Sequence, residues 1–152
     1  DLFDTIKRGK RIKSLDRIEG ELPFFTAGVE GMGFSDYIGN EEAEVFPQNS
    51  LTIDMFGNTY YRGYKYGADD HVTILYHSNN IYSKRVLQYM QTQINHTLHN
   101  KFSYSRNFYP SDAYDVEIKL PIIKKDVIDF VFIENYMIII EKKILNTLLN
   151  KI

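Results

Sequence analysis

Cationic, aromatic and hydrogen-bonding side chains recur together in three separated segments of this chain. Residues 6–17 read IKRGKRIKSLDR and hold six basic residues against one acidic residue, residues 58–66 read NTYYRGYKY, and residues 101–107 read KFSYSRN. Arginine and lysine donate to guanine edges, asparagine pairs with adenine, and hydroxyl groups bind phosphates or bases. The combination indicates nucleic-acid binding, with a tyrosine-rich sheet surface with charged rims as the alternative.

The overall charge limits how such binding works. Eighteen Lys and Arg residues stand against twenty Asp and Glu residues, which gives a formal net charge of −2. Attraction of phosphates by bulk charge is therefore excluded, whereas a local basic face that reads a groove is compatible with this balance. We expect the three segments to meet on one side of the domain, with the acidic residues elsewhere.

Catalytic motifs are scarce. The chain has no cysteine, which excludes disulfides, thiol nucleophiles and thiolate metal sites. Glu117 and Lys119, with Asp54, Asp112 or Asp115 upstream, resemble the arrangement by which nucleases hold Mg²⁺ and activate water. The simpler interpretation is a strand that leaves Glu117 and Lys119 in solvent. A small Mg²⁺-dependent nuclease is therefore the alternative function.

Two groupings have the residue types of metal ligands. Asp69, Asp70 and His71 are consecutive, but adjacent residues on a strand point to opposite faces, so we interpret them as a turn with capping carboxylates. His96 and His99 are interpreted as a surface pair on a helix. We expect no metal and no other cofactor.

Hydrophobic patterning predicts a mixed α/β domain. Alternation and β-branched or aromatic content predict strands at residues 21–26, 35–38, 50–55, 60–66, 71–76 and 115–120. A turn at Gly57 and Asn58 separates two of them, and the glycines at 28, 31 and 33 indicate a mobile loop. Residues 83–99 predict a helix, capped by Asn80 or Ser83 and closed by Asn100, because its apolar residues share one face: Leu87, Met90, Ile94 and Leu98.

A second predicted helix, at residues 128–152, carries two apolar stripes. The first comprises Ile133, Met137, Ile140, Ile144 and Leu148, and the second comprises Val131, Ile138, Leu145 and Ile152. The double stripe predicts that one side packs on the domain and the other on a partner helix, as in a coiled coil. A plain core helix is the alternative, and the charged residues of the segment argue against a membrane span.

Several motifs in order along the chain resemble the target recognition domains of type I restriction-modification specificity subunits and of related bifunctional type II systems. They are GKRIKSLDRIEGELPFFTAG at residues 9–28, SDYIGN at 35–40, LTIDMFG at 51–57, YKYGADDHV at 64–72, KFSY at 101–104, NFYP at 107–110 and IKLP at 118–121.

The resemblance implies a compact, β-rich α/β recognition domain at residues 1–125, followed by a long helix at residues 126–152. It implies sequence-specific binding of double-stranded DNA at a half-site, without catalysis by this chain. The implied partners are methyltransferase and restriction modules and a second recognition half, in a homodimer or an intact parent chain, and the implied location is the cytoplasm. Without an initiator Met, the chain is expected to be an excised fragment.

The candidate DNA contacts come from the three basic and aromatic segments. Arg62 and Arg106 are expected on bases, and Tyr60, Tyr61 and Ser105 on bases or phosphates. Lys7, Arg8, Lys10, Lys65 and Lys101 are expected on phosphates. The remaining candidates for DNA contact are Lys13, Asn58 and Tyr104.

Overall fold

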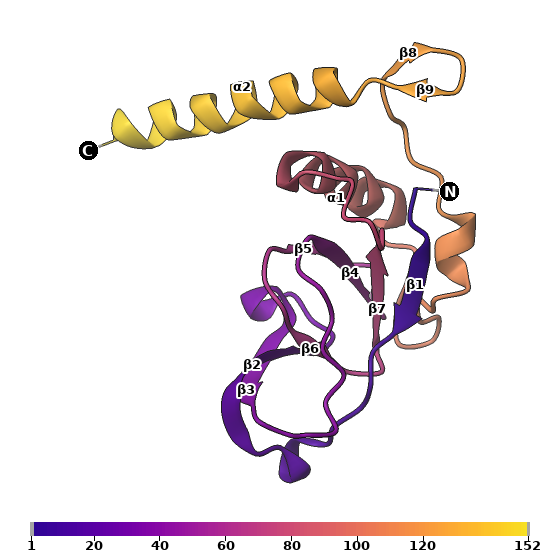
Figure 1. Cartoon of the computed structure of the whole chain (residues 1–152), viewed down its shortest axis with the longest axis vertical. Helices are drawn as coiled ribbons and strands as arrows, with labels where there is room; N and C mark the ends of the chain where they lie inside the picture. The colour runs from indigo at the N-terminus through magenta and orange to yellow at the C-terminus, as the bar shows by residue number, and fades with distance from the viewer. Residues whose placement is uncertain (1, 152) are drawn as a thin grey trace.

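The computed structural model describes residues 2–151, which form one central sheet with a smaller sheet beneath it and two α-helices above it (Figure 1). The central sheet, sheet A, has the order β1-β7-β4-β5, formed by Thr5–Arg8, Val72–Tyr76, Ser50–Asp54 and Thr59–Arg62. Sheet B has the order β3-β2-β6, formed by Phe34–Ile38, Glu19–Phe25 and Gly67–Ala68. The mixed α/β class predicted from the sequence is confirmed.

Both faces of sheet A are covered. Leu51, Ile53 and Leu75 pack against helix α1, Lys84–Leu98, in one apolar cluster. On the opposite face, Ile74 and Val72 pack with aromatic residues of sheet B and its connections in a second cluster. Every residue of β4 is buried for this reason, as is usual for a strand enclosed between two layers.

Helix α1 also completes the edge of β5. The side chain of Asn95 accepts from the Thr59 amide at 2.8 Å and donates to the Thr59 carbonyl at 2.9 Å, and Gln91 accepts from the Tyr61 amide at 2.8 Å. These amides take the place of a neighbouring strand and block edge-to-edge pairing. Ser83 caps the helix, as predicted, by accepting from the Val86 amide.

Some predicted elements differ from those observed. Residues 115–120 include the end of the short 3₁₀ helix η3, Asp112–Asp115, followed by an extended segment without a partner strand. Apolar and polar residues do alternate along this segment, because Val116, Ile118 and Leu120 pack directly on the apolar cluster beneath α1. The predicted strand at 60–66 ends at Arg62, and β6 begins only at Gly67. The small hairpin formed by β8, Ile122–Lys124, and β9, Val127–Ile128, was not predicted, nor was β1.

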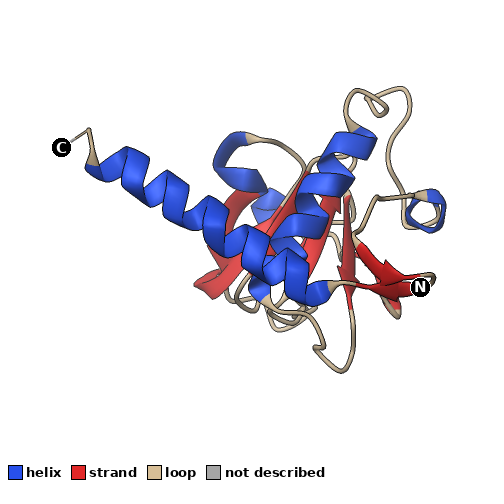
Figure 2. Cartoon of the chain, turned by 90° about the horizontal axis from the view of Figure 1, so that it is seen from above, coloured by secondary structure: helices blue, strands red, loops and turns tan. Residues whose placement is uncertain are grey.

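The C-terminal helix α2, Phe130–Leu149, is 20 residues long, or about 30 Å. Asp129 caps it, Ile133 is fully buried against the domain, and Arg85 of α1 pairs with Glu141 at 2.9 Å. The rest of α2 runs past α1 and projects from the body of the domain (Figures 1 and 2). Ile144, Leu145 and Leu148 are exposed there, and Ile152 lies outside the described residues. Among the described helices, none combines the length and the apolar character needed to cross a bilayer.

Candidate nucleic-acid interface

Several loops meet at one end of sheet A. In the antiparallel register Asp54 pairs with Val72, Ile53 with Thr59, and Arg8 with Thr73. The C-terminal ends of β4 and β1 and the N-terminal ends of β5 and β7 therefore coincide. We call this edge the loop end: it comprises residues 8–10, the turns at 55–58 and 69–71, and the loop at 99–111, which is attached by a hydrogen bond from the Phe108 amide to the Met55 carbonyl at 2.9 Å.

A tight hairpin projects from the 99–111 loop. Ser103 and Arg106 exchange backbone hydrogen bonds of 2.9 and 3.1 Å, so only Tyr104 and Ser105 form its tip. Tyr104 is 84% exposed, yet its ring is fixed edge-on against Phe56 of the 55–58 turn, with centroids 4.9 Å apart. The hairpin thus presents an aromatic ring and a hydroxyl group to solvent in a defined geometry.

Arg106 is held at the base of this hairpin by Asp112. Its guanidinium donates to both carboxylate oxygens, at 2.5 and 3.2 Å, and lies over the Phe102 ring at 5.0 Å. Asp112 also accepts from the Tyr109 amide at 2.7 Å. The hydrogen bonds from Arg106 lower the pKa of Asp112 and raise the pKa of Arg106, so the pair stays charged over an extended pH range.

Arg8 lies on the same side of the molecule as Arg106. Its guanidinium stacks over the Tyr109 ring at 5.9 Å and donates to the Asp70 carbonyl. Because the Tyr109 amide is bound to Asp112, both arginines sit next to one short segment of chain. The structure therefore brings together the first and the third of the segments singled out in the sequence.

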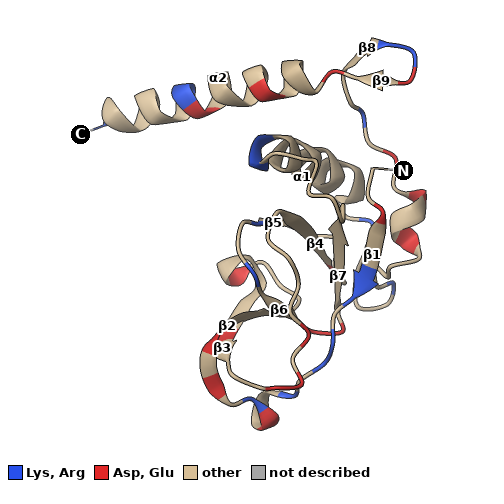
Figure 3. Cartoon of the chain, in the orientation of Figure 1, with Lys and Arg blue, Asp and Glu red and all other residues tan. Residues whose placement is uncertain are grey.

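The N-terminal lysines are exposed but partly engaged. Lys7 pairs with Glu44 at 3.1 Å, a contact that raises its pKa, and Lys10 donates to the Glu42 carbonyl at 2.7 Å. Lys13, just before the 3₁₀ helix η1, Ser14–Asp16, is exposed. Figure 3 shows basic positions on β1 and along the loop that follows it, with acidic positions close by. A phosphate bound by Lys7 must compete with Glu44.

Arg62 is buried, so the prediction that it contacts bases is wrong. It is 1% exposed, with its guanidinium 3.6 Å from the centroid of the Phe25 ring. Nε donates to Thr52 Oγ1 at 3.1 Å and Nη2 to the Met32 carbonyl at 2.7 Å. Burial lowers the pKa of this guanidinium. The physical reason is position on β5: Tyr60 and Arg62 alternate onto the face that sheet B covers.

The other candidates of the second segment hold the scaffold or lie away from the loop end. Asn58 donates to the carboxylate of Asp54, and the Tyr61 hydroxyl donates to Asn49. Burial raises the pKa of Tyr61 and also that of Tyr60. Lys65 is exposed at the opposite end of β5 from the 55–58 turn, whereas Lys101 is exposed at the start of the hairpin loop.

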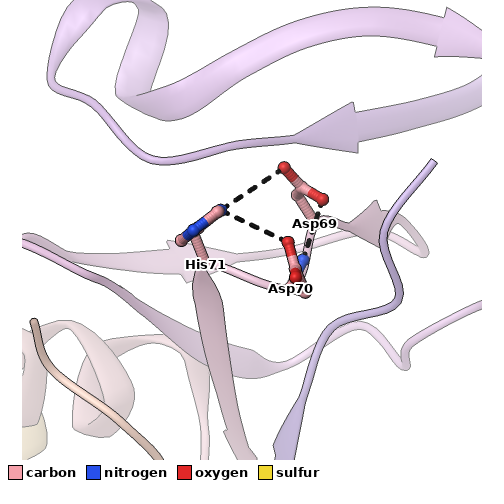
Figure 4. Close-up of side chains that lie close together, drawn as sticks. All are labelled: Asp69, Asp70 and His71. Atoms are coloured by element: carbon pink, nitrogen blue, oxygen red, sulfur yellow. Dashed lines mark hydrogen bonds and ion pairs between the residues drawn. The ribbon is translucent and has the colours of Figure 1, made fainter. Parts of the chain in front are cut away.

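Asp69, Asp70 and His71 lie in a turn, as predicted, in which Asp69 Oδ1 accepts from the Asp70 amide, but their side chains also converge (Figure 4). His71 Nδ1 lies 3.8 Å from Asp69 Oδ2 and 3.3 Å from Asp70 Oδ1, and one ligand atom from each residue falls within 4.8 Å of the others. The strand begins only at Val72, so the alternation expected for a strand does not apply. Arg8 lies 3.6 Å from Asp70 Oδ2 and supplies positive charge to the group. Burial raises the pKa of Asp69.

Among the described residues, Glu117, Lys119 and Asp54 do not come together as a nuclease site would require. Glu117 and Lys119 are exposed on the extended segment after η3, and Asp54 is buried with backbone and amide donors around both oxygens. Within residues 2–151, Asp69, Asp70 and His71 are the only three His, Asp or Glu residues close enough together to bind one metal ion. Glu117 does not belong to this cluster.

An exposed hairpin and two arginines over aromatic rings thus lie at one end of a sheet that α1 covers on one face and sheet B on the other. Residues 1–150 match the family of type I restriction modification DNA specificity domains, and the chain belongs to this family. Its members are specificity domains rather than catalytic modules.

Two relatives illustrate the similarity. The specificity subunit S.BcgI of a type II restriction enzyme of Heyndrickxia coagulans is 27% identical over 147 residues, which cover 95% of this chain and 42% of that protein. The crystal structure of a type I restriction-modification S subunit from M. genitalium aligns with a TM-score of 0.47 and 18% identity, over 69% of this chain and 28% of that chain. The chain therefore spans less than half the length of either relative.

Proposed function

We propose that this chain recognises one half of a split double-stranded DNA site and positions methyltransferase and restriction modules there, without chemistry of its own. The observation that carries the proposal, beside the family, is the meeting of the Ser103–Arg106 hairpin and Arg8 at the loop end. The major groove of B-DNA admits a two-stranded ribbon, so it is wide enough for this single-bridge hairpin, and each base pair presents a distinct pattern of donors and acceptors there.

The proposed contacts divide by chemistry. Tyr104, Ser105 and Arg106 at the hairpin face the bases, with Arg106 leaving Asp112 to donate to a guanine edge. Contacts to phosphate come from Arg8, Lys10 and Lys101, which are exposed at the loop end, from the exposed Lys13 before η1, and from Lys7 after exchange with Glu44. Tyr60, Tyr61 and Asn58 act on DNA indirectly, by holding the loops in place.

Helix α2 is proposed to join this domain to a second recognition half. Beyond its contact with α1, it offers exposed Ile144, Leu145 and Leu148, in the stripes that predict a helical partner. The partner is a second copy of the chain or the remainder of a parent polypeptide. Residues 1–125 would then read DNA, residues 126–152 would set the spacing, and the assembly would act in the cytoplasm.

Selection from a random DNA library, followed by sequencing, tests the proposal. The chain is assayed in its dimer or together with its modification subunits, because each half supplies only part of the affinity. We expect an enriched motif, loss of the preference at one base pair of that motif on Arg106→Ala, and an unchanged motif on Lys124→Ala in the remote β8–β9 hairpin. Equal recovery of all sequences would refute sequence-specific recognition. Cleavage of plasmid in Mg²⁺ that Glu117→Ala abolishes would instead support the nuclease alternative.

A further inference from the structure

The loop between β2 and β3, residues 27–33, is exposed yet firmly held. Its tip exposes Val29 and Met32, at 72% and 55%, and the carboxylate of Glu30. The Thr26 amide donates to the Gly33 carbonyl at 2.8 Å and closes the base of the loop. The glycines of this loop, taken from the sequence as a sign of mobility, instead allow a tight path, with Gly31 and Gly33 at positive φ.

Three side chains of sheet A bind the backbone of this loop. Asp54 Oδ2 accepts from the Gly28 amide at 2.9 Å, and the Tyr60 hydroxyl donates to the Gly28 carbonyl at 3.4 Å. Arg62 Nη2 donates to the Met32 carbonyl at 2.7 Å. The loop is thus fixed at both ends of its tip by residues from β4 and β5.

This arrangement is energetically costly. Burying a guanidinium without a carboxylate partner is unfavourable, and Arg62 Nη1 has no hydrogen-bond partner among the described residues. Met32 adopts φ +56°, a left-handed conformation that is strained for a side chain of this kind. Strain and buried charge of this kind persist where a fixed geometry is needed for function.

The carboxylate of Asp54, which binds the Gly28 amide at the base of the loop, also binds the turn that supports the Ser103–Arg106 hairpin. Asp54 Oδ1 accepts from the amides of Phe56 and Asn58, both at 2.9 Å, and so shapes the 55–58 turn. That turn contacts Tyr104 through Phe56. Asp54 therefore links the base of the 27–33 loop, through the 55–58 turn, to the Ser103–Arg106 hairpin.

We infer that residues 27–33 form a second base-reading element, in which Glu30 accepts a hydrogen bond from a cytosine amino group and Met32 contacts a thymine methyl group. The inference rests on the proposed function. A carboxylate is repelled by phosphates, so Glu30 is useful on DNA only where it meets a base donor. Asp54, Tyr60 and Arg62 are then positioning residues, which act through the loop backbone.

The test is library selection with the assembled protein and variants of the exposed tip. Glu30→Ala should reduce the preference for C·G over the other base pairs at one position of the motif by about 5- to 150-fold. Glu30→Gln should move that preference toward A·T, because glutamine pairs with adenine. Met32→Gly, which also relieves the positive φ, should weaken preference for a thymine without lowering thermal stability. Glu117→Ala, at an exposed acid on another segment, is the matched control.

The outcomes separate the two proposals. An enriched motif for the unaltered protein that Glu30→Ala, Glu30→Gln and Met32→Gly all leave intact overturns the loop's role and leaves the proposed function standing. Absence of any motif for the unaltered protein overturns both. For the positioning role, Arg62→Lys should alter selectivity at the pairs that Glu30 and Met32 read, measured well below its melting temperature. A folded Arg62→Lys variant with the original profile would refute that role.

Discussion

Asp112 binds both the guanidinium of Arg106 and the amide of Tyr109, so one carboxylate fixes the base of the exposed hairpin and the segment on which Arg8 stacks. A surface ion pair of this kind contributes little to folding. Its main effect is to orient Arg106, because a bidentate carboxylate restricts the rotamers of this exposed arginine.

Arg106→Ala should weaken binding of the cognate site about 5- to 150-fold and relax selectivity at one base pair. The reason is loss of a bidentate donor to a guanine edge. Competition binding against single-base variants of the selected motif measures the effect. Equal weakening on every sequence would instead mark Arg106 as a phosphate contact.

Lys10→Ala and Lys13→Ala should each weaken binding to all sequences alike. Loss of one phosphate contact releases about one counterion fewer, so the slope of log K against log salt concentration should fall by about one unit. Titrations at several salt concentrations supply the slope, with Lys124→Ala as the control. A slope equal to that of the unaltered protein would exclude the lysine concerned from the interface.

Arg62→Ala should destabilise the fold, because Arg62 is buried against Phe25 and bound to Thr52 and Met32. We expect the free energy of unfolding to fall by about 2–4 kcal/mol from lost packing and an unsatisfied carbonyl. Urea denaturation measures this loss. The exposed Lys65→Ala is the control, with a change within about 0.5 kcal/mol, and an equally small change at Arg62 would contradict its structural role.

Tyr66 should make the free energy of unfolding fall at alkaline pH. Burial raises the pKa of its phenol, whose hydroxyl lies 2.8 Å from Ser50 Oγ. Above a pH of about 10 the unfolded chain releases this proton while the folded chain retains it, so rising pH favours unfolding. Tyr66→Phe should cost about 1 kcal/mol at neutral pH and make the alkaline decline shallower. Denaturation curves between pH 7 and 11 would show an unchanged decline if Tyr66 were not responsible.

The exposed end of α2 should support association. Leu145→Glu combined with Leu148→Glu should reduce the self-associated fraction or prevent complex formation, because charges would enter an apolar helix contact. Sedimentation velocity measures the change, with Asn146→Glu on the same helix as the control. Association that survives the double substitution would place the interface elsewhere.

The strands and helix with strong periodic patterns were predicted well. β4, β7 and α1 carry runs of apolar residues that match their spacing, and the bounds agree to within a residue or two. Residues 115–120 have the alternation of a strand, but packing on the core satisfies it without a neighbouring strand. Alternation of apolar and polar residues indicates that one side of an extended chain is buried. It does not indicate that the backbone pairs with another strand.

Arg62 shows why the site was harder to predict than the fold. Tyrosines and arginine on one strand suggest a polar surface, whereas α1 covers one face of β5 and sheet B covers the other. Residues 59–62 carry no local sign of this second layer, which is formed by β2, β3 and β6 from other parts of the sequence. The role of the 27–33 loop was missed for the same reason, because its anchors lie on β4 and β5.

The two-residue tip between Ser103 and Arg106 has a consequence for how new targets arise. Its framing hydrogen bonds belong to the main chain, and Phe102 and Phe108 anchor the stem in the core, so neither depends on what occupies the tip. Replacing Tyr104 or Ser105 by other residues changes neither the length of the hairpin nor the contacts that anchor it. Sequence preference is thereby free to diverge through single codon changes while the protein continues to fold.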